Sequence, residues 1–189
     1  MCMIYHEIAH IYRGHLSLYG KWEKEKSVEK HYLDIQTMEW DADCYAASQL
    51  AKVVDMLNKG VLINDTTDFA LQVILGSILG MMFWERQKDD FDKVYENEHP
   101  PMYYREIAII ATMSDLLHCE KEKAERYVIG YEKAFSKVFG IDVRKSDTYF
   151  LNAVKNKDML KKIEENWDVV KEQLKTFSVF PLEEVDELF

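Results

Sequence analysis

Apolar residues recur every three or four positions through most of this chain, a spacing that places them on one face of an α-helix. The clearest example lies near the C-terminus and consists of Leu160, Ile163, Trp167, Val170 and Leu174. This spacing predicts an amphipathic helix over about residues 156–177. No run of alternating apolar and polar residues predicts a strand with similar clarity. The pattern therefore predicts an all-α fold.

Five more helices are predicted from the same spacing and from residues that favour helix ends. Their approximate ranges are 3–19, 33–58, 69–84, 101–118 and 120–139. Gly20, Gly60 and Gly140 are expected to end three of them, because glycine readily adopts the left-handed conformation that often follows a helix. The charged residues 21–31 are expected to form a solvated loop or a fraying helix end.

Composition narrows the class of protein. The 189 residues suffice for a single domain, 1–189, and a hydrophobic content of 48% is too high for intrinsic disorder. A formal net charge of −10 argues against a surface that binds nucleic acid. The cysteines Cys2, Cys44 and Cys119 are widely spaced and form neither a disulfide framework nor a CxxC metal motif. These features favour a cytoplasmic protein.

The 16 residues from Phe69 to Trp84 form the longest apolar stretch of the chain. The stretch contains Gln72 and Ser77, and it is slightly shorter than the roughly 17–25 residues that span a bilayer. A buried core helix is therefore the favoured interpretation. A helix in or against a membrane is the alternative.

Residues His6-Glu7-Ile8-Ala9-His10 form an HExxH motif. Residues four apart share one face of a helix, so both imidazoles can reach one Zn²⁺ while Glu7 lies toward a metal-bound water. The isoleucines within and around the motif indicate a buried helix. Burial of a polar cluster is costly, and a bound metal would account for it.

A catalytic zinc takes a third protein ligand, and Glu39 in the segment Met38–Asp43 is the best candidate. Asp43 follows it by four residues, so it shares the Glu39 face and can accept a hydrogen bond from a zinc-bound imidazole. Asp41 and Asp43 are competing ligands, although Asp41 points away from that face. His15 follows His10 by five residues rather than the six of an HExxHxxGxxH motif. It is interpreted as a residue behind a ligand or on the surface.

The segments HEIAHIYRGHL and MEWDADCYAA resemble the gluzincin metallopeptidases with HExxH and ExxAD motifs, and the local pattern is closest to the phage-exclusion peptidase family. The same group includes membrane-associated zinc proteases. The resemblance covers about residues 4–50 and a short HP…R element at 99–105. It implies a site composed of the zinc ligands His6, His10 and Glu39, the general base Glu7, and Asp43, which orients a zinc-bound histidine.

The HP…R element resembles one found downstream in several such peptidases. It implies that His99 helps to stabilise the oxyanion and that Arg105 lies beside the site. The alternative is that Pro100 and Pro101 begin a helix and that Arg105 pairs with an acidic residue.

Zincins normally have a twisted sheet before the HExxH helix, whereas only five residues precede His6 here. The expected fold is therefore the helical C-terminal part of a metallopeptidase that lacks its N-terminal sheet. A natural start upstream of Met1 is favoured as the reason.

Three functions are open on these observations. The favoured one is an enzyme, a zinc metallopeptidase that hydrolyses peptide bonds in a protein or peptide substrate. The second is a membrane-associated zinc protease. The third is a non-catalytic helical interaction module whose metal site is degenerate or structural. The sequence predicts no oligomeric state.

Overall fold

The structure is a computed structural model that describes residues 2–60, 93, 95–117, 137, 158–179 and 182. These residues contain five α-helices, a short 3-10 helix and no strand, which confirms the predicted all-α fold. The helices are α1 (Cys2–Tyr12), α2 (His15–Lys24), α3 (Tyr32–Gly60), α5 (Met102–Leu116) and α8 (Asp158–Leu174), and the 3-10 helix is η1 (Val28–His31).

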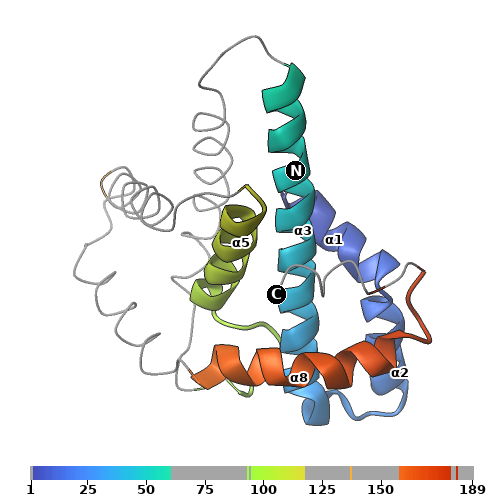
Figure 1. Ribbon diagram of the computed structural model, residues 1–189. Helices are drawn as coiled ribbons and strands as arrows, with labels where there is room; N and C mark the ends of the chain where they lie inside the picture. Colours follow the sequence, from blue (N-terminus) through green and yellow to red (C-terminus); the bar gives the residue numbers. More distant parts are fainter. Residues whose placement is uncertain are drawn as a thin grey trace.

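Helix α3 lies at the centre of the described fold, with α1, α5 and α8 packed against it. Figure 1 shows α1 and α2 on one side of α3 and α5 on the other side, and α8 crosses α3 near the N-terminal end of α3. A functional side chain on α3 can therefore meet partners from several helices.

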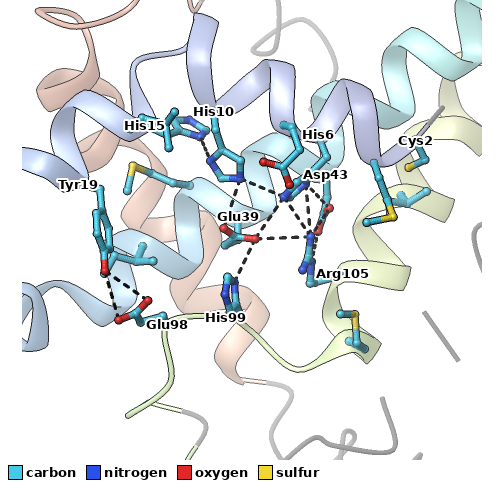
Figure 2. A pocket seen from close by; sticks show the side chains of 17 residues that line it. Cys2, His6, His10, His15, Tyr19, Glu39, Asp43, Glu98, His99 and Arg105 are labelled. Atoms are coloured by element: carbon cyan, nitrogen blue, oxygen red, sulfur yellow. Dashed lines mark hydrogen bonds and ion pairs between the residues drawn. The ribbon is translucent and has the colours of Figure 1, made fainter. Parts of the chain in front are cut away.

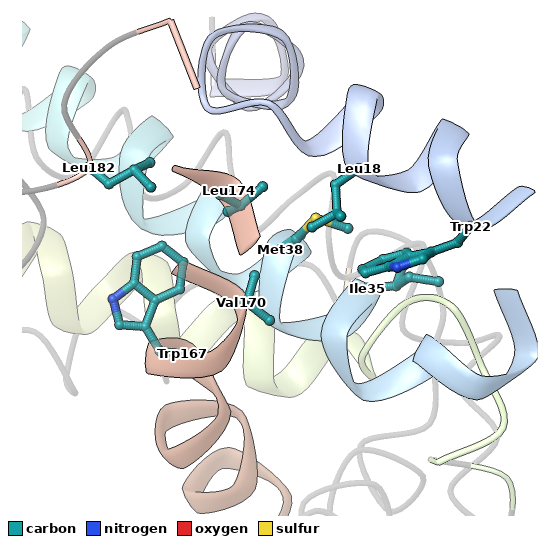
Figure 3. Packing of buried hydrophobic residues seen from close by; sticks show 8 residues of the cluster. All are labelled: Leu18, Trp22, Ile35, Met38, Trp167, Val170, Leu174 and Leu182. Atoms are coloured by element: carbon teal, nitrogen blue, oxygen red, sulfur yellow. The ribbon is translucent and has the colours of Figure 1, made fainter. Parts of the chain in front are cut away.

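Three apolar clusters hold the helices together, and α3 contributes to each. The first joins α1, α3 and α5 through Cys2, Ala46, Ala47, Leu50, Ile109 and Met113. The second joins α2, α3 and α8 through Leu18, Trp22, Ile35, Met38, Trp167, Val170, Leu174 and Leu182 (Figure 3). The third joins α3, α5 and α8 through Trp40, Cys44, Tyr104, Ala108, Met159 and Ile163. The small alanines of α3 allow α1 and α5 to approach it closely.

The single helix predicted over 3–19 is wrong, because the chain turns a corner at Gly14 between α1 and α2. Gly14 has a φ of 83°, in the left-handed region that favours glycine. A Cβ atom at this position would lie 2.6 Å from the backbone carbonyl carbon of Phe177. The corner therefore needs glycine for its backbone conformation and for the close approach of the segment after α8.

The predicted helix end at Gly20 is also wrong, because α2 continues to Lys24. Leu18 and Trp22, on either side of Gly20, are both buried in the second apolar cluster. Burial of these side chains outweighs the roughly 1 kcal/mol that glycine costs within a helix.

The charged segment 21–31 is more ordered than predicted. Its first residues form the last turn of α2, and Val28–His31 forms η1. The His31 ring stacks on Trp22 with 4.2 Å between the ring centres. Aromatic packing therefore anchors a segment whose composition indicated a loop.

The helices predicted over 33–58, 101–118 and 156–177 are confirmed as α3, α5 and α8. The helices predicted over 69–84 and 120–139 lie outside the described residues. Within the described part of the chain, no helix combines the length and the apolar character needed to cross a membrane.

Candidate metal centre

Two helices bring together three side chains of the types that can bind a metal. His6 and His10 lie one turn apart on α1, and Glu39 lies on α3, which packs against α1. One ligand atom from each of the three lies within 4.8 Å of the others. All three side chains are largely buried, with 8%, 8% and 7% of their residue surface exposed.

The distances within this group are those of ligands around one small cation. Nε2 of His6 lies 3.0 Å from Nε2 of His10 and 3.4 Å from Oε2 of Glu39. Nε2 of His10 lies 3.3 Å from Oε1 of Glu39. Tetrahedral zinc with bonds of about 2.0–2.1 Å separates its ligand atoms by about 3.3 Å. The donor types and their spacing therefore fit zinc.

Asp43 and Arg105 support His6 from behind (Figure 2). Oδ1 of Asp43 lies 2.9 Å from Nδ1 of His6. Arg105 on α5 donates two hydrogen bonds to Asp43, 2.7 Å from Nε to Oδ2 and 2.9 Å from Nη2 to Oδ1. The carboxylate is thus held in place between the arginine and the imidazole.

His10 has a different partner behind it. Its Nδ1 lies 3.0 Å from Nδ1 of His15, the first residue of α2. Nε2 of His15 lies 3.1 Å from Oδ2 of Asp41, and Nε of Arg13 donates a hydrogen bond to the same oxygen. His15 is 1% exposed and Asp41 is fully buried.

The pKa values of the two histidines on α1 are shifted in opposite directions. Burial alone would lower the pKa of His6, but its hydrogen bonds with Asp43 and Glu39 outweigh burial and raise this pKa to about 9. Burial lowers the pKa of His10 to about 4, against the attraction of Glu39. His10 is therefore neutral near pH 7, as a metal ligand must be.

Both carboxylates that face these histidines are held ionised. Burial would raise the pKa of Glu39, but hydrogen bonds with His6 and His99 and the charge of Arg105 hold it well below its usual range. Burial acts in the same way on Asp43, and Arg105 outweighs it and lowers the pKa. An ionised Glu39 can only accept hydrogen bonds or bind a cation.

The group formed by His6, His10 and Glu39 consists mainly of acceptors that face one another. Two carboxylate oxygens and two imidazole nitrogens converge within hydrogen-bonding distance or slightly beyond it. The guanidinium of Arg105 already lies at its edge, with Nη2 3.5 Å from Oε2 of Glu39 and 3.4 Å from Nε2 of His6. A proton on an imidazole nitrogen or a metal ion between the acceptors would stabilise the arrangement further. The raised pKa of His6 has the same cause, because the neighbouring carboxylates favour a positive charge on this ring.

A pocket of about 440 Å³ opens beside this group. Glu7, the expected general base, is exposed and lines this pocket together with His6, His10 and Glu39. His99 precedes α5, and Nδ1 of its 66% exposed side chain lies 3.3 Å from Oε2 of Glu39. Figure 2 shows the His99 ring approaching Glu39 from the side opposite α1.

The structure brings the predicted site residues together around one pocket, which His15 also lines. Asp41 is not among the ligand atoms that converge with His6 and His10, and it contacts His15 instead. His15 lies directly behind His10 and is not on the surface. The sequence held a signal for this contact, because Gly14 allows the chain to turn a corner just before His15.

Comparisons with known proteins add no name to this site. No family model matches the chain, and neither the curated proteins nor the solved structures contain a significant match.

Proposed function

We propose that this protein is a zinc-dependent peptidase whose centre is formed by His6, His10 and Glu39. The observation that carries the proposal is the convergence of two imidazoles and a carboxylate at the spacing of tetrahedral zinc ligands, beside an open pocket. A catalytic zinc site needs three protein ligands and an open position, and this donor set offers three.

When bound, zinc would lower the pKa of a water and polarise a scissile carbonyl. Glu7 supplies the base, because its exposed carboxylate lies in the same pocket, one residue after a ligand. It would accept a proton from the attacking water and return it to the leaving amine.

His99 supplies a second polar group at the pocket. Its imidazole is held by Glu39 yet remains 66% exposed, so it can reach a substrate at the rim. Hydrogen bonding with Glu39 raises its pKa, which favours the protonated ring. A protonated imidazole here would stabilise negative charge on the substrate carbonyl oxygen.

The pocket lining favours a protein or peptide substrate with apolar side chains. The apolar residues that line it include Leu16, Ile35, Met38, Met102 and Ile109. These surfaces flank a polar centre, which is the usual arrangement of a site that orients an apolar ligand through a few polar contacts.

The test separates metal binding from hydrolysis. Glu7→Gln should retain one zinc per chain and lose at least about 100-fold in the rate of peptide cleavage, since it removes the base and leaves the ligands. His10→Ala should lose the zinc as well. Zinc is measured by elemental analysis, and cleavage of an unfolded protein substrate by mass spectrometry.

Glu29→Gln is the matched control, because Glu29 is an exposed glutamate on η1 and does not line this pocket. It should behave like the unmodified protein in both measurements. Zinc-loaded Glu7→Gln protein that cleaves as fast as the parent would contradict the role of Glu7. Stoichiometric zinc without cleavage in the parent would favour a structural metal site in an interaction module.

A further inference from the structure

A buried chain of four side chains runs from the metal-binding group into the corner between α1 and α2. It begins at His10 and continues through His15 and Asp41 to Arg13. His15 and Asp41 are 1% and 0% exposed, so water does not compete for their hydrogen bonds. This chain is called the His15 relay below.

The order of protons along the relay follows from its acidic end. Asp41 beside Arg13 is a carboxylate and can only accept, so Nε2 of His15 must carry the hydrogen that lies between them. In a neutral His15, Nδ1 then has no hydrogen and accepts. The hydrogen between the two rings must therefore belong to Nδ1 of His10.

This order has a direct consequence for the metal-binding group. A neutral His10 with its hydrogen on Nδ1 has a free electron pair on Nε2, the atom that faces His6 and Glu39. We infer that His15 and Asp41 are positioning residues that fix His10 in the tautomer needed for metal binding. The inference rests on the proposed function and deepens it.

The fold supports the relay at both ends. The left-handed Gly14 turns the corner between α1 and α2, and His15 directly after it contacts the ring of His10. At the other end, Cζ of Arg13 lies 5.8 Å from the ring centre of Trp167 on α8. Arg13 is thus packed against the C-terminal helix while it holds Asp41.

The relay is tested first in the metal-free full-length protein, by long-range proton–nitrogen NMR of ¹⁵N-labelled histidines. His10 should carry its hydrogen on Nδ1, and His15 should carry its hydrogen on Nε2. The opposite tautomer on either ring would overturn the inference. This measurement needs neither zinc nor activity.

The second measurement is zinc affinity, by competition with a chromogenic chelator. His15→Leu should weaken zinc binding by about 10–100-fold, the usual effect of removing the partner of a metal-bound histidine. His15→Gln retains one acceptor and one donor and should recover much of the loss. An affinity in His15→Leu equal to that of the unmodified protein would overturn the positioning role.

His31→Leu is the matched control. His31 also contacts a carboxylate, 2.8 Å from Nδ1 to Oδ2 of Asp34, and it does not line the pocket beside the metal-binding group. It should leave zinc affinity unchanged, and an equal loss in this variant would overturn the inference by assigning the effect to stability. An unmodified protein that binds no zinc would contradict the proposed function. The proton order is tested separately, by the ring tautomers of the metal-free protein.

Discussion

The two histidines of the HExxH motif lie one turn apart on the same helix, yet the protein supports them in different ways. His6 contacts the carboxylate of Asp43 directly, and Arg105 of α5 holds that carboxylate. His10 reaches the carboxylate of Asp41 only through the ring of His15.

The comparison shows how one short segment of α3 supports both histidines. Asp41 and Asp43 each pair with an arginine. Asp43 contacts His6 on α1, whereas Asp41 contacts His15 just after the corner between α1 and α2. The His6 side draws its arginine from α5, whereas the His10 side draws Arg13 from the α1–α2 corner. Damage to one side should therefore leave the other largely intact.

The largest expected effect is on stability and falls on the His10 side. Asp41→Ala should lower the free energy of unfolding by about 3–5 kcal/mol, because it leaves the buried guanidinium of Arg13 without its carboxylate. Asp43→Ala should cost less, since Arg105 also lies 3.5 Å from Oε2 of Glu39. Urea denaturation followed by circular dichroism measures both losses.

A double variant, Arg13→Leu with Asp41→Leu, serves as the control for this difference. It removes both charges, so it should recover part of the stability lost in Asp41→Ala. Equal losses in Asp41→Ala and Asp43→Ala would contradict the proposed asymmetry between the two sides.

The next effect is on how the free energy of unfolding depends on pH, and each of the two histidines should change it by about 3 kcal/mol over its own pH range. In the chelator-treated protein, His6 has a pKa raised from 6.5 to about 9, so its contribution is complete below about pH 6.5 and is lost as the pH rises through 9. His10 has a pKa lowered to about 4, so its contribution is complete above about pH 6.5 and is lost as the pH falls toward 4.

Unfolding free energies between pH 4 and pH 10 check this contrast. His6→Gln should flatten the alkaline decline in stability, and His10→Gln should flatten the acidic one. If both variants flatten the same side of the profile, the two imidazoles are not supported in the opposite ways described.

The smallest expected effect on the candidate metal site comes from Gly14→Ala, because the variant removes none of the side chains of this site. The left-handed backbone at Gly14 costs alanine about 1–2 kcal/mol, and the close backbone of Phe177 must also shift. The variant should weaken zinc binding through the His10 side while the contact of His6 with Asp43 stays intact. Thermal unfolding and chelator competition measure the two effects, and Gly20→Ala, where nothing lies within 4 Å of the added Cβ, is the control.

Much of the candidate site could be predicted from spacing within helices. His6 and His10 share a face because they are four residues apart, and the same rule joins Glu39 to Asp43. The His15 relay could not be predicted in this way. Its members come from three helices, α1, α2 and α3, and from the corner between α1 and α2. Asp41 also lies two residues from Glu39, on a different face of α3.

The sequence by itself determined the helical class, the approximate bounds of α3, α5 and α8, and the two segments that carry the candidate metal-binding side chains. These depend on periodicity and on local spacing, which neighbouring residues set. Only the tertiary structure decided the corner at Gly14, the continuation of α2 through Gly20, and the burial of His15 against Asp41. Each of these depends on packing between residues far apart in the chain, where burial of Trp22 or a close approach to Phe177 outweighs local preference.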